Sequence, residues 1–154
     1  MTNTQSVIKS VSTGRIACVL LVEDNEDDVY LTREAFESGG LRVNLHHVDN
    51  GVKCLQFLRR EGIYGDAPTP DIILLDMHMP LMDGHDVLTE IVKDPKLQHL
   101  VVVVLTTSGE ASDIRKMYDL RCNSYITKPV DFDNFTKLIS GLTGYWLTVV
   151  KLPE

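Results

Sequence analysis

The sequence predicts an α/β fold in which helices cover both faces of a doubly wound, five-stranded parallel sheet. Short runs of consecutive apolar residues at 16–22, 72–75 and 100–105 have the length and composition of strands that are buried on both faces. Strand-like and helix-like patterns alternate five times along the chain, which favours a parallel sheet with right-handed crossovers. Residues 41–48 alternate between apolar and polar side chains instead, so we expect a half-exposed strand at a sheet edge.

The first half of the chain is expected to contain two strands and two helices. The run IACVLLV at 16–22 leads directly into an acidic stretch. An amphipathic helix begins near Asp27 and ends before Gly39-Gly40, because glycine commonly follows a helix end. The alternating strand at 41–48 is followed by the turn residues Asp49-Asn50-Gly51, which open a second helix.

The second half repeats the strand and helix pattern three times. A loop with two glycines and two prolines at 60–70 precedes the strand at 72–75. The elements that follow are a helix from Asp83-Gly84 to before Pro95, the strand at 100–105, a helix capped by Ser112 or Asp113, a short strand at 125–127 and a last helix that Asp131 caps.

The patterns also predict the order of the strands. Fully apolar strands need neighbours on both sides, whereas an alternating strand belongs at an edge, and the order 2-1-3-4-5 satisfies both conditions. The residues that follow the first and third strands, Glu23, Asp24 and Asp76, then meet where open α/β sheets bind ligands. Taken alone, Asp76 is equally well explained as a cap for the next segment.

Composition limits the classes of protein to which the chain can belong. Its 154 residues suffice for one domain with a real core, and its longest apolar runs are too short to cross a bilayer. The net charge of −7, without a basic stripe, argues against nucleic-acid binding. Three scattered cysteines suggest reduced thiols, and residues 1–14 lack signal-peptide features, so we expect a mobile tail on a cytoplasmic protein.

Three carboxylates in one crevice repel one another and need a positively charged partner at neutral pH. No lysine or arginine lies close in sequence to the two acidic loops, so the expected partner is a hard divalent cation, and few carboxylates with water ligands suit Mg²⁺. In the alternative, Glu23 and Asp24 only cap the first helix and complement its dipole, which leaves them crowding Asp76 without compensation.

Two further strand ends carry polar groups. Thr106 ends the fourth strand with a hydroxyl, and Lys128 ends the fifth with an ammonium. A cation, a hydroxyl and an ammonium around one carboxylate form a receptor for a phosphoryl group, because they stabilise its oxygens during transfer. Aspartate is a known covalent acceptor of phosphoryl groups, so the pattern predicts this chemistry at Asp76.

The strand-end motifs resemble the receiver domain of two-component response regulators, which has a flavodoxin-like fold. The resemblance covers about residues 16–142. It is carried by Glu23-Asp24, the segment DMHMPLMDG at 76–84, Thr106, and the segment YITKP at 125–129.

This resemblance implies a role for each motif residue. Asp76 is expected to be the phosphoacceptor, and Glu23, Asp24, Asp76 and the backbone carbonyl of His78 are expected to hold Mg²⁺. Lys128 and Thr106 are expected to bind the phosphoryl group, and Thr106 and Tyr125 to form a switch pair. The phosphodonor histidine is expected to belong to a separate sensor histidine kinase.

The loop at 60–70 and an apolar tail make the chain similar to the small response regulators paired with cyanobacterial phytochromes. We therefore expect a receiver domain at 15–142, an apolar extension at 143–154 and a phytochrome-type kinase partner. Since no output domain follows in this sequence, phosphorylation is expected to switch a surface that binds an unknown downstream protein. The only expected chemistry is the chain's own phosphorylation and dephosphorylation, without enzymatic turnover of a substrate.

The apolar tail predicts an interface. Apolar residues continue past the last helix at spacings of three or four, and Tyr145, Trp146 and Val149 lie beyond the end of the sheet. Aromatic residues in an uncovered patch commonly anchor interfaces, so we expect a symmetric homodimer built on the final strand, the final helix and this tail. In the alternative, the tail folds back onto its own domain.

Three other functions fit parts of the pattern. A flavodoxin-like cofactor binder would need a phosphate loop rich in Ser, Thr and Gly, where this chain has the acidic run 23–28. A metal-dependent phosphohydrolase with an aspartyl nucleophile commonly has a second carboxylate two residues later, where this chain has His78. A receiver that acts only as a docking module would not need the complete set of phosphoryl-site residues.

Overall fold

The computed structural model describes residues 16–38, 42–107, 109–128 and 131–144. The predicted tail at 1–14 lies outside these residues, as do the predicted interface residues Tyr145, Trp146 and Val149. These expectations therefore remain predictions.

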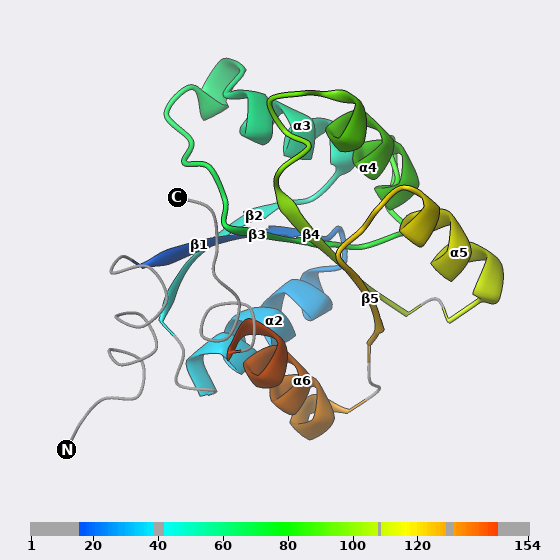
Figure 1. Ribbon diagram of the computed structural model, residues 1–154. Coiled ribbons are helices and arrows are strands. Elements are labelled where there is room, and N and C mark those ends of the chain that lie inside the picture. Colours follow the sequence, from blue (N-terminus) through cyan, green and yellow to red (C-terminus); the bar gives the residue numbers. More distant parts are fainter. Residues whose placement is uncertain (1–15, 39–41, 108, 129–130, 145–154) are drawn as a thin grey trace.

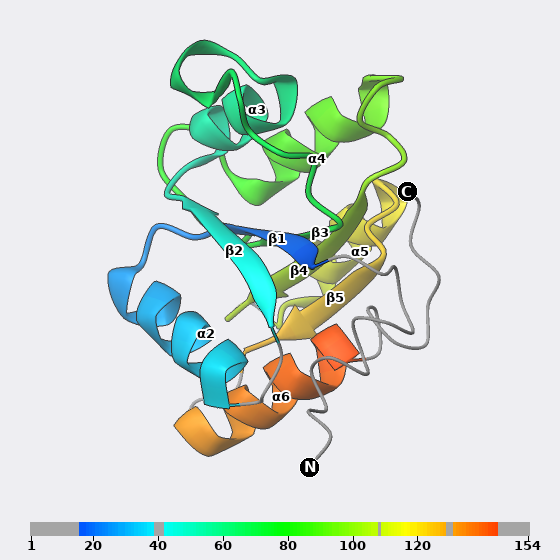
Figure 2. The ribbon, with the colours of Figure 1, turned by 90° about the vertical axis from the view of Figure 1, so that its left-hand side faces the viewer.

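Five parallel strands form one sheet in the order β2-β1-β3-β4-β5, which confirms the predicted topology. Figure 2 shows β2 at one edge of this sheet. The strands are β1 (Ala17–Val22), β2 (Val43–Val48), β3 (Ile72–Leu75), β4 (Val101–Thr106) and β5 (Ser124–Thr127). All residues of β1, β3 and β4 are buried, whereas Val48 alone is buried in β2, as expected for an interior set of strands and an edge strand.

Helices cover both faces of the sheet (Figure 1). They are α2 (Glu26–Ser38), α3 (Gly51–Arg59), α4 (Gly84–Lys93), α5 (Ala111–Asp119) and α6 (Phe132–Gly144), with a short 3-10 helix, η1 (Gly62–Tyr64), in the loop before β3. In Figure 1, α3 and α4 lie above the sheet, and α2 and α6 lie below it. None of the helices that the structure describes combines the length and apolar character needed to cross a bilayer.

The alternation of side chains along β1 divides the core into two layers. Leu20 and Val22 pack in the cluster that includes residues of α3, α4 and α5. Val19 and Leu21 pack in the other cluster, with residues of α2 and α6. A strand that is apolar on both faces is therefore required at the centre of this fold, and β1 satisfies that requirement.

Local capping explains most helix starts, with one correction. The Asn50 side chain accepts a hydrogen bond from the Lys53 amide (2.8 Å) at the start of α3, and Asp131 accepts one from the Asn134 amide (2.9 Å) at the start of α6. The expected cap of α5 at Ser112 or Asp113 is wrong, because the helix begins earlier, at Ala111. Its N-cap is Glu110, whose side chain makes no capping hydrogen bond, so the preference of Ser and Asp for caps does not decide this boundary.

All three cysteines are free and buried, which agrees with the expected reduced thiols. Burial raises the pKa of the Cys54 thiol to about 12 and that of Cys122 to about 11. The thiolate is the reactive form of cysteine, so these two thiols are protected both by burial and by protonation at pH 8.

We therefore expect the native protein at pH 8 to react with a disulfide reagent such as dithionitrobenzoate only as fast as it unfolds. Protein in concentrated guanidinium should react at once with three equivalents, one for each cysteine. Absorbance of the released thionitrobenzoate measures both rates. A rapid stoichiometric reaction of one thiol in the native protein would contradict the burial of that cysteine.

Candidate functional site

Hydrogen bonds between neighbouring strands continue past the strand ends and hold three polar residues in register. The Glu23 amide donates to the Val48 carbonyl (3.1 Å), and the Asp76 amide donates to the Val22 carbonyl (3.1 Å). At the other side of the sheet the Lys128 amide donates to the Thr106 carbonyl (2.7 Å). The backbone positions of these residues are therefore set by the sheet itself.

The structure brings the three predicted carboxylates together. Glu23, Asp24 and Asp76 each offer an oxygen atom, and these atoms lie within 4.8 Å of one another. Glu23 is 2% exposed and Asp76 is 8% exposed, whereas Asp24 is exposed to solvent. The crowding expected from the strand order is therefore present.

Lys128 supplies a cationic partner that sequence proximity does not reveal. Its side chain is 6% exposed, and its ammonium donates hydrogen bonds to Glu23 Oε1 and to Asp28 Oδ2, the latter at 2.9 Å. The chain separates Lys128 from these carboxylates by 105 and 100 residues, so only the fold brings them together. The contact with Asp28 was not predicted, because an acid in the first turn of a helix is already explained by the helix dipole.

Burial dominates the electrostatics of this group. Burial raises the pKa of Glu23 to about 7; the hydrogen bond from Lys128 lowers it, and the charge of Asp76 raises it. Burial by itself lowers the pKa of Lys128, but its hydrogen bonds to Glu23 and Asp28 and the charges of Glu23 and Asp76 outweigh this effect, and its pKa is raised. Lys128 therefore remains protonated at neutral pH and neutralises only part of the negative charge around it.

The donor atoms fit a hard divalent cation. All three are carboxylate oxygens, which are the ligands that Mg²⁺ and similar ions prefer. Neighbouring oxygens around an octahedral Mg²⁺ are about 3 Å apart and opposite ones about 4.2 Å, so oxygens within 4.8 Å of one another must move closer together to share one ion. The residual negative charge favours such an ion.

The predicted phosphoryl-binding and switch residues lie along β4 and β5. Thr106 ends β4 and is fully buried. Tyr125 is partly buried and packs against the core cluster beneath α3, α4 and α5. Tyr125 is paired in register with Val104, two residues before Thr106, so Thr106 and Tyr125 lie on the same face of the sheet.

Comparison with known proteins assigns the family. The model of the response regulator receiver domain matches residues 19–140 of this chain. The chain belongs to the response regulator receiver family. The family implied by the strand-end motifs is therefore confirmed.

Relatives of this receiver include phytochrome response regulators. Response regulator Rcp1 of Synechocystis sp. is 37% identical over 135 residues, which covers 88% of this chain and 92% of Rcp1. The crystal structure of the phosphorylated cyanobacterial phytochrome response regulator RcpA has a TM-score of 0.87 at 38% identity and covers 91% of this chain and 100% of that chain. The Mn²⁺-bound form of Rcp1 has a TM-score of 0.84 at 36% identity over 90% of this chain and 99% of that chain. The expected similarity to this group of receivers is confirmed.

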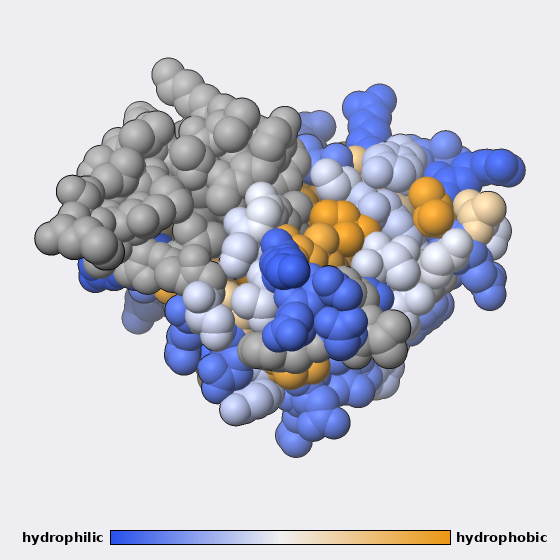
Figure 3. Space-filling model, turned by 90° about the horizontal axis from the view of Figure 1, so that it is seen from below, coloured by the Kyte–Doolittle hydropathy of each residue, from blue (hydrophilic) through white to orange (hydrophobic). Residues whose placement is uncertain are grey.

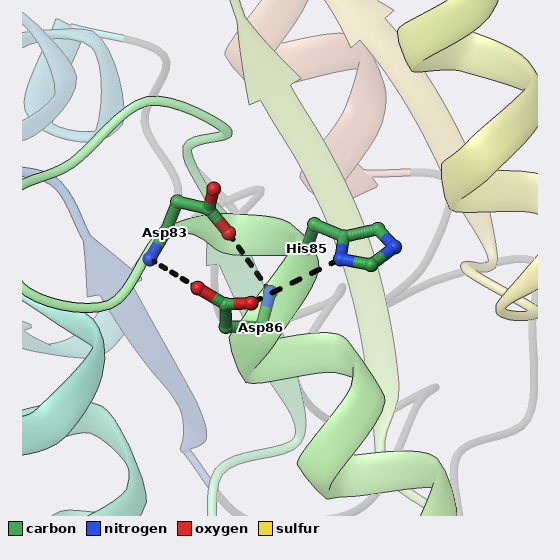
Figure 4. Close-up of side chains that lie close together, drawn as sticks. All are labelled: Asp83, His85 and Asp86. Carbon is green, nitrogen blue, oxygen red and sulfur yellow. Dashed lines mark hydrogen bonds and ion pairs between the residues drawn. The ribbon is translucent and has the colours of Figure 1, made fainter.

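A second group of potential ligands, Asp83, His85 and Asp86, lies at the start of α4 (Figure 4). The Asp86 amide donates to Asp83 Oδ1 (2.9 Å), and the Asp83 amide donates to Asp86 Oδ2 (3.4 Å), which forms a capping box. His85 Nδ1 lies 4.0 Å from Asp86 Oδ1. Both carboxylates already stabilise the helix start, so the cap explains this cluster.

Gly84 allows α4 to pack directly against the backbone that follows β3. Its amide donates to the Met77 carbonyl (2.8 Å). A Cβ atom at this position would lie 2.4 Å from the Asp76 carbonyl oxygen and 2.9 Å from Met77 Cα. Because both neighbours are backbone atoms held by β3, only glycine fits without moving the strand end.

We expect Gly84→Ala to lower the free energy of unfolding by roughly 1–3 kcal/mol, the usual cost of overpacking a buried site. The matched control is Gly141→Ala in α6, where a Cβ atom would meet nothing within 4 Å. There alanine should raise stability by about 0.5–1 kcal/mol, because it restricts the unfolded chain more than glycine. Urea denaturation followed by circular dichroism measures both. Equal effects at the two positions would contradict the close approach of Gly84 to Asp76.

Proposed function

We propose that this response regulator accepts a phosphoryl group from a sensor histidine kinase onto Asp76. The observation that carries the proposal is the position of Asp76, a buried carboxylate that follows the central strand β3 and shares a crevice with Glu23 and Asp24. Lys128 and Thr106 follow or end the neighbouring strands and supply an ammonium and a hydroxyl. A buried acid in such surroundings has the groups that phosphoryl transfer requires.

In the proposed reaction, a carboxylate oxygen of Asp76 attacks the phosphorus of a phosphohistidine. The new P–O bond forms as the P–N bond breaks, and the histidine leaves with the electron pair of that bond. Lys128 and Thr106 bind the phosphoryl oxygens. Glu23, Asp24, Asp76 and the His78 carbonyl are the proposed ligands of Mg²⁺, which would neutralise charge on the phosphoryl group when bound.

The relatives suggest the partner. Rcp1 and RcpA are response regulators, and RcpA is described as a cyanobacterial phytochrome response regulator. We therefore propose a phytochrome-type histidine kinase as phosphodonor and a cytoplasmic site of action. The net charge of −7 supports a protein partner rather than a nucleic acid as the downstream target. The proposed chemistry is limited to phosphorylation and dephosphorylation of the chain itself.

Incubation with Mg²⁺ and acetyl phosphate should add the mass of one phosphoryl group to the wild-type protein. The increase should disappear without a divalent ion and in Asp76→Asn, because the acceptor or its charge compensation is then missing. Intact-mass spectrometry provides the measurement. Asp66→Asn, at an exposed aspartate in the loop before β3, is the control and should label normally. Normal labelling of Asp76→Asn would rule out the assignment of the acceptor.

We also propose that a second copy of the chain binds beside β5 and α6. Figure 3 views the molecule from the side of α2 and α6 and shows an apolar patch among polar residues. The described apolar residues of β5 and α6 that remain partly exposed are Tyr125, Ile126 and Leu138. The predicted anchors Tyr145, Trp146 and Val149 continue from α6 in the sequence. Ile126 and Leu138 pack against the core cluster on this side of the sheet, whereas Tyr125 packs against the opposite cluster, so the proposed switch residue neighbours the proposed interface along β5 without facing it.

Deletion of the chain after Thr143 should convert a dimer into a monomer, because it removes the aromatic anchors. Light scattering coupled to gel filtration measures the mass with and without phosphodonor. The single substitution Trp146→Ala should weaken the dimer in the same direction. A full-length protein that remains monomeric in both phosphorylation states would exclude the dimer.

A further inference from the structure

We propose that Asp28 is a positioning residue that retains the Lys128 ammonium in a resting position and so opposes its binding to a phosphoryl group on Asp76. This inference rests on the proposed function, in which Lys128 binds that group. It concerns a carboxylate that lies outside the cluster formed by Glu23, Asp24 and Asp76.

The helix start fixes the position of Asp28. Asp28 lies in the first turn of α2, and its amide donates to Asn25 Oδ1 (3.0 Å). The Thr32 hydroxyl donates to the Asp28 carbonyl (2.7 Å) one turn later. With its backbone held at both polar groups, the side chain can present Oδ2 to Lys128 Nζ at 2.9 Å.

The ion pair between Lys128 and Asp28 is partly shielded from solvent, which strengthens the attraction between the two charges. The Lys128 side chain is 6% exposed and that of Asp28 is 30% exposed, so water screens this contact less than it screens a surface pair. An ammonium has three N–H donors, and the structure shows Glu23 and Asp28 as acceptors for two of them. One N–H remains for a phosphoryl oxygen, but the ammonium can move toward that oxygen only by lengthening its contacts with these two acceptors.

The two acceptors differ in what a bound cation does to them. Glu23 belongs to the group of carboxylates that can share a divalent ion, so such an ion competes with Lys128 for it. Asp28 is not in that group and keeps its full attraction for the ammonium. Asp28 is therefore the retaining contact that remains when the crevice binds a cation.

A role limited to helix stability makes a different prediction. Glu26 and Asp27 lie in the same first turn and also complement the positive end of the helix dipole. Asp27 is exposed, and the structure shows no hydrogen bond or ion pair from its carboxylate to a described residue. Asp27→Asn therefore removes the same charge from the same turn without touching Lys128.

The test compares the affinities for beryllofluoride, a mimic of the phosphoryl group, in the presence of Mg²⁺. Isothermal titration calorimetry on the full chain should show roughly fivefold tighter binding for Asp28→Asn, a size typical of coupling between contacting charged residues. Asp28→Glu should restore affinity toward that of the wild type, and Asp27→Asn should change it little. The initial rate of labelling by acetyl phosphate should follow the same order.

A double-mutant cycle separates retention of Lys128 from a general loss of negative charge. In a Lys128→Gln background, Asp28→Asn should have no further effect, because the contact is already gone. An equal effect in both backgrounds would assign the change to charge alone and overturn the proposal. Unchanged binding of beryllofluoride by the single variant Asp28→Asn would also overturn the proposal. Weaker binding would overturn it too, because it would show that Asp28 presents the ammonium to the phosphoryl group.

A second measurement does not depend on the Lys128 variant. The ammonium protons of Lys128 should exchange with water faster in Asp28→Asn than in Asp27→Asn, as observed by nitrogen-15 NMR, because one acceptor is lost. Equal exchange rates would argue against the retaining contact. If wild-type protein neither binds beryllofluoride nor labels with acetyl phosphate, the proposed function itself fails. If wild type does both and Asp28→Asn behaves like Asp27→Asn, only this inference fails.

Discussion

All strands of a parallel sheet end at the same edge, and this constraint determines where the residues of the candidate site lie. The residues that follow β1, β3 and β5 must lie near one another once the strands are in register. Backbone hydrogen bonds continue that register into Glu23, Asp76 and Lys128. The site is therefore held by the same interactions that hold the sheet, and Gly84 brings the start of α4 against the backbone of Asp76.

Negative charges outnumber positive ones at this edge of the sheet, and the excess favours the binding of a cation. Among the described residues, Glu23 and Asp28 accept hydrogen bonds from the Lys128 ammonium, and Asp24 and Asp76 crowd Glu23 in the same crevice. Placing ionised groups in a poorly solvated crevice is unfavourable unless each has a partner, and one lysine cannot satisfy them all. A divalent cation and a phosphoryl group, when bound, would change these pairings. The resting protein thus holds Lys128 in contacts that compete with the proposed reaction.

Sequence reasoning predicted what depends on local pattern. The apolar runs of β1, β3 and β4 and the alternation in β2 specify which strands are interior, and the strand order then places Glu23, Asp24 and Asp76 together. The partner of Lys128 could not be predicted in this way, because a contact across 100 residues leaves no periodic signal. The start of α5 was predicted too late in the chain. The helix already begins at Ala111, so Ser112 and Asp113 lie inside its first turn and cannot act as its N-cap.

Lys128 also connects the carboxylate crevice to one helical layer. In the sequence it is four residues before Phe132, where α6 begins, and four residues span at most about 14 Å. The helix α6 packs against α2, and the first turn of α2 carries Asp28, which binds the Lys128 ammonium. Lys128 is thus tied to α2 by its ion pair with Asp28 and to α6 by the chain itself, and the two helices contact each other. A displacement of the ammonium would therefore change the load on the contact between these two helices, on the face of the sheet opposite to Thr106 and Tyr125.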